Sequence, residues 1–365
     1  MNNKTKTALI TLMLLPPLIA GCGTTETRPP EAEKPSALFY PPLPNPPRIQ
    51  YLTSFSKESD IAVKKDGFAK FVLGEKEQSE REIEKPYGVA LYDGKIYAVD
   101  TRGPGYVIFD LVNRQYRVVF GGGGGAMRKP INIVIDEDGN KYITDTQREQ
   151  VLVFDREERF LRAFGEEGQF KPGDVEIVDN RLFVSDLAHH NIQVLDKETG
   201  ELLYKFGSVG AEPGFLMYPT NLAVGPDNRL YISDTGNFRL DVYTLEGDYI
   251  RSYGGLGRAL GQFARPKGVT VDRDGRIHVV DAAFQTIQMF APDGHLLLFY
   301  GEPGNEPGQL NLPTDVEIDY ENAGVFQSYA APGFQLEYVI LVANQFGPNK
   351  ITVYGFGRMK GMEYP

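Results

Sequence analysis

The sequence contains no tryptophan, one cysteine and four histidines, and each scarcity excludes a kind of chemistry. A single cysteine, Cys22, cannot form an intramolecular disulfide or a cysteine-rich metal site, and no Cys-x-x-Cys-His motif attaches a haem to this chain. The formal net charge of −11 argues against nucleic acid as a partner, because its phosphates would be repelled.

A hydrophobic run long enough to cross a bilayer is also missing. The apolar run from Ala8 to Ala20 is too short, but it follows Lys4 and Lys6, which is the pattern of a signal peptide. The run ends in Leu18-Ile19-Ala20-Gly21-Cys22, which resembles the lipobox of bacterial lipoproteins. The resemblance implies cleavage of residues 1–21 and lipid attachment at Cys22; the alternative is an ordinary signal peptide with a chance cysteine.

The segment after Cys22 predicts a tether. Residues 22–47 are polar and rich in proline, a composition that cannot build a core and that forms a semi-rigid extended spacer. With the lipobox resemblance, this implies a protein of the bacterial cell envelope that a lipid holds on the membrane. Gly23, rather than aspartate, follows the cysteine, so the same resemblance favours the outer membrane if the host has two membranes.

The rest of the chain is organised by a repeat. Short runs of β-forming residues, separated by Gly, Asp and Asn, recur after a proline with a period of about 42–47 residues. Four strands at this period predict one blade of a β-propeller, and six repeats predict an all-β fold with six blades of four antiparallel strands. The repeats start at Pro86, Pro130, Pro172, Pro219, Pro266 and Pro313.

The repeats resemble the NHL family. The resemblance depends on an aspartate that ends the second strand, on the pair Asn237 and Arg239, and on a Gly-x-x-Gly-x-x-x-Gly-x-(Phe/Leu) run such as Gly254–Phe263. It implies a β-propeller over residues 48–365 that serves as a protein-binding platform, as NHL propellers mostly do.

The two ends of this domain complement each other. The last repeat has no fourth strand, whereas residues 48–56 resemble a fourth strand without neighbours, so we expect this N-terminal strand to complete the last blade and close the ring. Residues 57–85 then connect to the first blade, with a short helix expected over Gly67–Gln78. An insertion from Tyr320 to Glu337 is expected to be an irregular loop packed on its own aromatic residues, with a binding element as the alternative.

The aspartates that end the second strands are predicted to be structural. Because they recur from blade to blade, whereas a catalytic residue is needed only once, each is expected to cap a loop through backbone N–H groups. They are Asp100, Asp145, Asp186, Asp234 and Asp281, and Asn344 replaces them in the last blade.

The candidate site is the mouth of the central channel. Residues two positions after each repeat proline are expected near this mouth, and blades 3 and 6, which face each other, share the run Asp-Val-Glu-Ile. Carboxylate and amide oxygens suit a hard cation such as Ca²⁺, and the alternative is a water-filled channel with solvated acids. The ligand candidates are Asn132, Asp174, Glu176, Asn221, Asp315 and Glu317.

Histidine chemistry is expected to be absent from this site. A zinc centre would need several histidines to converge, whereas His189 and His190 lie on a mouth-side loop, His278 within a strand and His295 on the opposite face. We expect no catalytic residue and no bound zinc there. Gly121–Gly125 leads into a strand rather than a helix, which excludes a phosphate-binding loop.

Charge differs between the two faces of the predicted disc. Acidic turns lie opposite the mouth, whereas the mouth face carries a set of cations. Such asymmetry would orient a charged partner. These cations are Arg102, Arg128, Lys129, Arg148, Lys171, Arg258, Arg265 and Lys267.

The sequence therefore predicts a monomeric, membrane-tethered interaction platform that binds proteins of the envelope. Two other functions stay open. One is a metal-dependent hydrolase or lyase at the channel mouth, similar to six-bladed lactonases or amidating lyases. The other is a sugar- or polymer-binding surface protein, which the absence of tryptophan disfavours.

Overall fold

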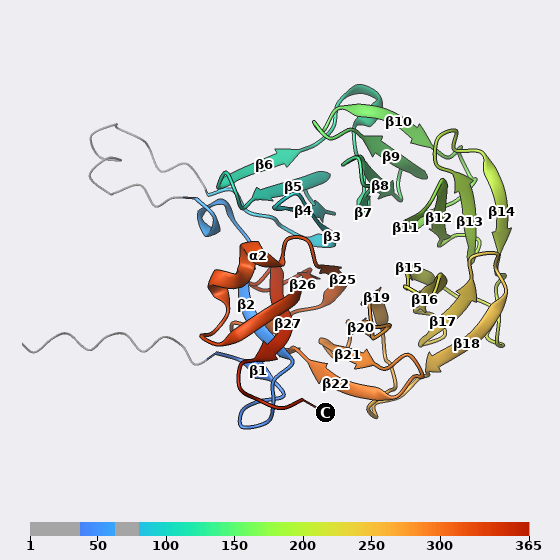
Figure 1. Cartoon of the computed structure of the whole chain (residues 1–365). Helices are drawn as coiled ribbons and strands as arrows, with labels where there is room; N and C mark the ends of the chain where they lie inside the picture. Colours follow the sequence, from blue (N-terminus) through green and yellow to red (C-terminus); the bar gives the residue numbers. More distant parts are fainter. Residues whose placement is uncertain (1–36, 63–79, 365) are drawn as a thin grey trace, which may run out of the picture. The chain divides into compact units, whose positions relative to one another are not determined.

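The computed structural model describes residues 37–62 and 80–364, which form six β-sheets arranged as blades around a common axis (Figure 1). Cys22, the leader and the helix expected over residues 67–78 lie outside the described residues. No helix in the described part of the chain is long and apolar enough to cross a membrane.

Five blades are built from four consecutive antiparallel strands, and the first strand of each lies nearest the axis (Figure 1). Blade 1 contains β3 (Pro86–Tyr92), β4 (Lys95–Asp100), β5 (Gly105–Asp110) and β6 (Gln115–Val119). Blade 2 contains β7 (Pro130–Ile135), β8 (Lys141–Asp145), β9 (Gln150–Phe154) and β10 (Phe160–Phe164). Blade 3 contains β11 (Pro172–Val178), β12 (Arg181–Asp186), β13 (Asn191–Asp196) and β14 (Leu202–Phe206). Blade 4 contains β15 (Pro219–Val224), β16 (Arg229–Asp234), β17 (Arg239–Thr244) and β18 (Tyr249–Gly254). Blade 5 contains β19 (Pro266–Val271), β20 (Ile277–Asp281), β21 (Thr286–Phe290) and β22 (Leu296–Tyr300).

The sixth blade joins both ends of the described chain. Its strands are β25 (Pro313–Asp319), β26 (Phe334–Asn344), β27 (Ile351–Met359), β2 (Ile49–Phe55) and β1 (Phe39–Tyr40). Strand β2 pairs antiparallel with β27, which is the closure that the sequence predicts.

Strand β1 was not predicted. Phe39 and Tyr40 pair with Gln50 and Ile49 of β2, and Phe39 is buried with its ring 5.6 Å from that of Phe334. These residues therefore belong to the propeller, although the sequence analysis assigned all of residues 22–47 to the tether. The surrounding prolines dominate the composition of the segment and conceal two aromatic residues that pair and pack.

The insertion in blade 6 is ordered and partly joins the core. It contains α2 (Ala323–Phe326) and the 3₁₀ turn η3 (Gln327–Tyr329), and β26 begins at Phe334. Phe326 and Phe334 are buried, whereas Tyr329 is exposed. Phe326 packs into the core between blades 6 and 1, so the insertion is more than a loop resting on its own aromatic residues.

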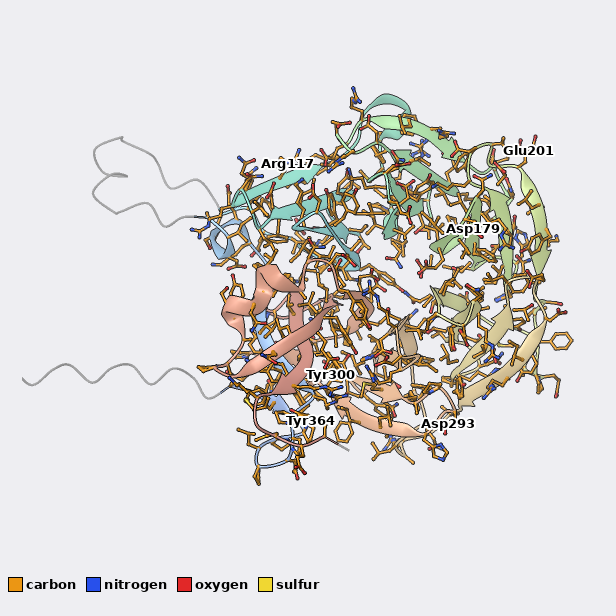
Figure 2. All side chains as sticks on the ribbon, in the orientation of Figure 1. Arg117, Asp179, Glu201, Asp293, Tyr300 and Tyr364 are labelled. Carbon is orange, nitrogen blue, oxygen red and sulfur yellow. The ribbon has the colours of Figure 1, made fainter. Side chains whose placement is uncertain are left out.

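The core lies between neighbouring blades, whose side chains fill the spaces between the sheets (Figure 2). In one such layer, Tyr106 and Ile108 of blade 1 pack with Ile133 and Ile143 of blade 2. The inner strands of each sheet are largely buried, whereas the fourth strands are partly exposed at the outer rim, so a single repeat could not bury its own core. The labelled residues Arg117, Glu201 and Asp293 lie at the outer rim (Figure 2).

The glycine-rich run after the fourth strand forms a tight loop that inserts an apolar side chain into this core. Leu256 forms a parallel bridge with Phe263, and Phe263 is fully buried. Gly254 has a φ of +81°, and a Cβ there would lie 2.4 Å from the Phe263 ring. Only glycine fits this position. In the next repeat, β23 (Glu302–Pro303) forms a similar parallel pair with β24 (Gln309–Leu310). The remaining described elements are two 3₁₀ turns, η1 (Glu58–Asp60) and η2 (Gly123–Gly125).

The strand-ending aspartates act as structural clamps, as predicted, and they hold two loops each. Asp281 accepts backbone N–H groups of Ala283 and Phe284 in its own hairpin, at 2.9 and 3.1 Å. It also accepts those of Ala264 and Arg265, which lead into the first strand of the blade, at 2.7 and 3.2 Å. The clamps thus fix the connections that form the channel mouth.

Candidate functional site at the channel mouth

The first strands bring the predicted acids and amides together around the channel. Asn132 Nδ2 donates to Asp174 Oδ1 at 2.6 Å, and Asp174 Oδ2 accepts the backbone N–H of Leu222 at 2.8 Å. Asp315 Oδ2 accepts the N–H of Val89 at 3.0 Å. Each carboxylate therefore reaches across to the next blade, so these side chains hold the ring together.

A cavity of about 80 Å³ lies within this ring. Its lining includes Asn132 and both acid pairs, Asp174 with Glu176 and Asp315 with Glu317. Asn221, the sixth candidate, is fully buried and is not among the residues that line the cavity. Five of the six predicted residues thus share one small space, which is large enough for a few water molecules.

The acids in this cavity hold their protons more tightly than usual. Burial raises the pKa of Glu176 to about 8 and that of Asp315 to about 6. Burial also raises the pKa of Asp174 and Glu317 well above their usual range, with further contributions from Asp315 and Glu176 respectively. At neutral pH the cavity therefore carries less negative charge than four carboxylates would suggest.

Blade 4 differs from its neighbours at this ring. In blades 2 and 3 the ring residue donates its backbone N–H to a hydroxyl on the second strand: Asn132 donates to Thr144 at 3.0 Å, and Asp174 donates to Ser185 at 2.8 Å. The corresponding Ser233 hydroxyl in blade 4 is buried without a partner among the described residues. Both amide atoms of Asn221 are likewise unpartnered there.

The donor set fits a metal ion poorly. In the described part of the chain, no three His, Cys, Asp or Glu side chains converge in an arrangement that could hold a metal ion. Asp174 already accepts the N–H of Val175 at 2.8 Å besides those of Leu222 and Asn132, which leaves few free lone pairs for a cation. A cation here would require this hydrogen-bond network to open.

The histidines lie apart, as the sequence predicts. His189 Nδ1 is 2.6 Å from Asp186 Oδ2, whereas His190 packs edge-on against Tyr218. His278 is buried beside Tyr300 and Tyr338, and burial lowers its pKa to about 3. His295 is exposed next to Asp293.

Around the channel lies a rim of cations on the surface that we call the mouth face, formed by the fourth-to-first connections and the second-to-third hairpins. The residue before each repeat proline occupies an equivalent position in all six blades, because its carbonyl accepts the N–H that follows the second strand. This position is basic in four blades and holds Lys85, Lys129, Lys171 and Arg265. The rim of the channel mouth therefore carries cations in four of its six blades.

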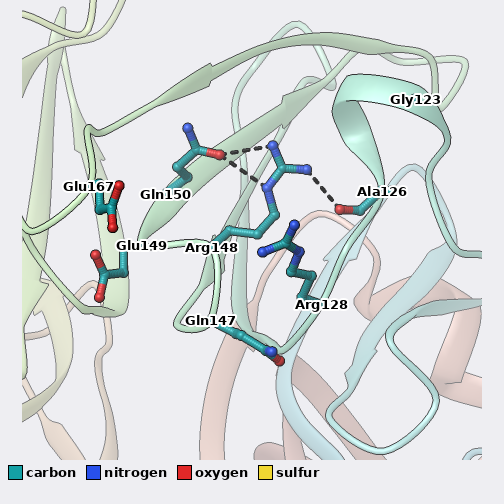
Figure 3. Close-up of a pocket in the computed structure, with 8 residues that line it drawn as sticks. All are labelled: Gly123, Ala126, Arg128, Gln147, Arg148, Glu149, Gln150 and Glu167. Atoms are coloured by element: carbon teal, nitrogen blue, oxygen red, sulfur yellow. Dashed lines mark hydrogen bonds between the residues drawn. The ribbon is translucent and has the colours of Figure 1, made fainter.

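A polar groove of about 640 Å³ opens on the mouth face over the β8–β9 hairpin of blade 2, between the connections to blades 1 and 3 (Figure 3). Arg148 is fixed there by bonds to the carbonyl of Ala126 at 2.7 Å and to the Gln150 side chain at 2.8 Å. Arg128 also lines the groove, and Glu149 and Glu167 line its other side (Figure 3). Because Arg148 serves the adjoining loop, Arg128 is the cation that this groove offers to a ligand.

Comparisons with known proteins agree with the fold. A protein-family model described as a 6-bladed beta-propeller matches residues 169–254. Protein brain tumor of Drosophila melanogaster is 31% identical over 96 residues, which cover 24% of this chain and 9% of that protein. This chain thus spans about a tenth of the length of that curated relative.

Solved structures of similar shape come from several kinds of protein. A protein of unknown function from Bacteroides thetaiotaomicron has a TM-score of 0.57 and 18% identity, over 84% of this chain and 75% of that one. A gluconolactonase from Xanthomonas campestris has a TM-score of 0.54 and 15% identity, over 75% and 86% of the two chains. A virginiamycin B lyase from Staphylococcus aureus has a TM-score of 0.52 and 15% identity, over 74% and 80%. The chain is a six-bladed β-propeller, and at these identities the likeness establishes the fold alone.

Proposed function

We propose that this protein is an interaction platform whose mouth face binds an acidic surface of another protein in the cell envelope. The observation that carries the proposal is a difference in ion pairing between the two faces. On the mouth face, Arg128, Lys129, Lys171, Arg258 and Arg265 are exposed and form no ion pair with any described residue. On the mouth face Arg102 pairs with Glu84 at 3.2 Å. Opposite the mouth, most cations other than Arg114 are neutralised within the described chain: Arg156 lies 3.1 Å from Asp93, and Arg159 lies 2.7 Å from Asp155.

Unpaired cations gathered on one face of an acidic protein are available to a partner. They raise the rate of encounter with an acidic surface and orient it toward the mouth. Exposed apolar side chains accompany them, among them Tyr218, Leu256 and Leu260, and Leu256 is 67% exposed. Apolar residues beside cations are what a protein partner uses for affinity, whereas charge alone supplies orientation.

The anchor belongs to the same proposal. The run Leu18–Cys22 supports lipidation at Cys22, the repeats support an NHL-type propeller, and a proline-rich tether would hold the disc away from a membrane. Metabolic labelling with an alkyne fatty acid tests the anchor. We expect label on the wild-type chain and none on Cys22→Ser; label that persists on Cys22→Ser would refute it.

Charge reversal tests the platform. The double variant Lys171→Glu, Arg258→Glu should lose most of the envelope protein that co-purifies with the wild type after mild crosslinking in native membranes. The matched control is Lys205→Glu, because Lys205 is exposed on the outer strand β14, away from the mouth. Equal recovery by both variants would refute the proposal, and loss by both would indicate dependence on total charge rather than on this face.

A metal-dependent hydrolase or lyase at the channel mouth is the second candidate. The four acids around one cavity favour it, because perturbed pKa values gather at catalytic sites. The crowded hydrogen bonds of Asp174 argue against it. Calcium-dependent lactone hydrolysis that Asp174→Asn and Asp315→Asn abolish, with the fold intact, would support the enzyme; no turnover with or without calcium would exclude that reaction.

A further inference from the structure

The mouth of the channel contains a buried lysine without a counter-charge. Lys267 is the second residue of β19 and is only 8% exposed. Its ammonium group forms no hydrogen bond and no ion pair within the described residues, and it is not among the fully buried polar atoms, so it keeps some access to solvent. An ammonium group that keeps little contact with water and has no partner is costly, so mostly buried lysines are usually paired with an anion.

Three carboxylates on the elements around β19 are committed elsewhere. Asp281, at the end of β20, holds four backbone N–H groups, and Asp315 on β25 accepts the N–H of Val89. Asp234, at the end of β16, accepts the N–H of Met217 and the amide of Asn237. None of these acids forms an ion pair with Lys267. The charge that acts on Lys267 is the guanidinium of Arg265, which has the same sign and, together with burial, lowers the pKa of the lysine.

The backbone around Lys267 is held from both sides, and burial restricts the side chain itself. The Arg265 carbonyl accepts the N–H of Ala282 at 2.9 Å, and the Pro266 carbonyl accepts the Thr235 hydroxyl at 2.6 Å. Next along the strand, Gly268 packs so closely on β25 that a Cβ would lie 2.5 Å from Asp315 Cα. A preorganised cation costs little further ordering when a ligand binds.

We propose that Lys267 and Arg265 form a subsite that binds a single carboxylate, presented by the acidic partner at the channel mouth. This inference depends on the proposed platform function, and it specifies one chemical group of the partner and the two residues that bind it. Arg265 is exposed and free of ion pairs in the described chain, so its planar fork can clamp a carboxylate that the Lys267 ammonium also contacts. A singly charged anion suits the place better than a phosphate, because the acids of the channel lie nearby and would repel a second negative charge.

Burial, with a smaller contribution from Arg265, lowers the pKa of Lys267 to about 8. A carboxylate bound beside it must raise this pKa, which provides a readout that a merely structural lysine would not give. The full-length protein, labelled with ¹³C at the lysine Cε, can be titrated by NMR, with Lys267 assigned through Lys267→Met. Hexaglutamate is the probe, and hexaglutamine is the uncharged control.

We expect hexaglutamate to raise the Lys267 pKa by at least about one unit, and Lys267→Met to weaken its binding about tenfold, as loss of a charge-assisted hydrogen bond does. Arg265→Met is a second variant at an exposed position, and it should weaken the binding of hexaglutamate by a similar factor. Lys205→Met is the matched control and should change nothing.

An unchanged Lys267 pKa at saturating hexaglutamate, or equal affinity of Lys267→Met and the wild type, would overturn the subsite. Failure of the subsite is distinguishable from failure of the platform. If Lys171→Glu, Arg258→Glu releases the envelope partner while the Lys267 signal stays unchanged on binding, the platform stands and the subsite falls. If neither responds, both fall.

Discussion

Asn132 of blade 2 donates its side-chain amide to Asp174 of blade 3 across the boundary between the two blades, at 2.6 Å. Both residues are buried, so a hydrogen bond to water cannot readily replace this one if it is lost. The same Asp174 carboxylate accepts the Leu222 N–H of blade 4. One acid thus joins three successive blades, which explains why the acids of the channel are structural whether or not they also bind a ligand.

Removal of the Asn132 side-chain amide should therefore lower the stability of the propeller. Asn132→Ala leaves Asp174 with one hydrogen bond fewer in a buried place, and we expect a loss of about 1–3 kcal/mol in the free energy of unfolding. Denaturant unfolding measures the change. Gln147→Ala is the control, because the Gln147 side chain is exposed and forms no hydrogen bond within the described chain. Equal stability of Asn132→Ala and the control would contradict the role given to Asn132.

Stability should fall as pH rises. The pKa of Glu176 is raised to about 8 by burial, above its value in the unfolded chain. The folded state therefore holds a proton that the unfolded state releases, so this contribution is complete below about pH 4 and is lost as pH rises toward 8. We expect the melting temperature to decrease between about pH 5 and pH 8, and less steeply in Glu176→Gln. Glu201→Gln, at an exposed position, should keep the wild-type slope. Parallel curves for Glu176→Gln and the wild type would refute this.

The glycine that ends the fourth strand of blade 4 should not tolerate a side chain. Gly254→Ala would place a Cβ against the buried Phe263 ring at a φ of +81°. We expect a loss of at least about 2 kcal/mol, because both backbone strain and overpacking contribute. Gly122→Ala is the matched control: its φ is −157°, and a Cβ there would meet nothing within 4 Å. If both substitutions proved neutral, the glycine-rich run would not have the packing role described above.

Replacement of an aspartate clamp should lower the stability of the fold, more with alanine than with asparagine. Asp281→Ala leaves four backbone N–H groups without their acceptor, and we expect a loss of about 2–4 kcal/mol. Asp281→Asn keeps one acceptor oxygen, as Asn344 does in blade 6 toward the N–H of Asn311, and should lose about half as much. Asp248→Ala, in an exposed turn, serves as the control. A loss in Asp281→Ala no greater than that in the control would exclude a clamping role.

Much of the fold could be predicted because it depends on repetition. The prolines and strand-ending aspartates fix the period, and the missing fourth strand of the last repeat points to residues 48–56. Strand β1 escaped prediction because pairing of Phe39 and Tyr40 with β2 is visible only once β2 occupies the last blade. Residues outside the repeat have no copies with which to be compared.

The sequence predicted where the candidate site lies, but it did not predict which hydrogen bonds its residues form. Counting from the repeat prolines located Asn132, Asp174 and Asp315, but their bonds to the next blade depend on how blades face one another. Lys267 could be placed on the mouth face, yet nothing in the sequence signals its burial without a partner. Equivalent positions hold residues as different as Tyr87 and Gly173, so the repeat gives no guide there.

The central claim is that a partner docks on the mouth face, and site-specific photocrosslinking tests it most directly. Tyr218 on the mouth face and Phe299 on the outer strand β22 are both aromatic and 50% and 49% exposed, so a benzoylphenylalanine at either position should perturb the fold equally little. In native membranes, the probe at position 218 should crosslink one envelope protein, and the probe at position 299 should not. Crosslinking from position 299 but not from position 218, or from neither, would contradict the account.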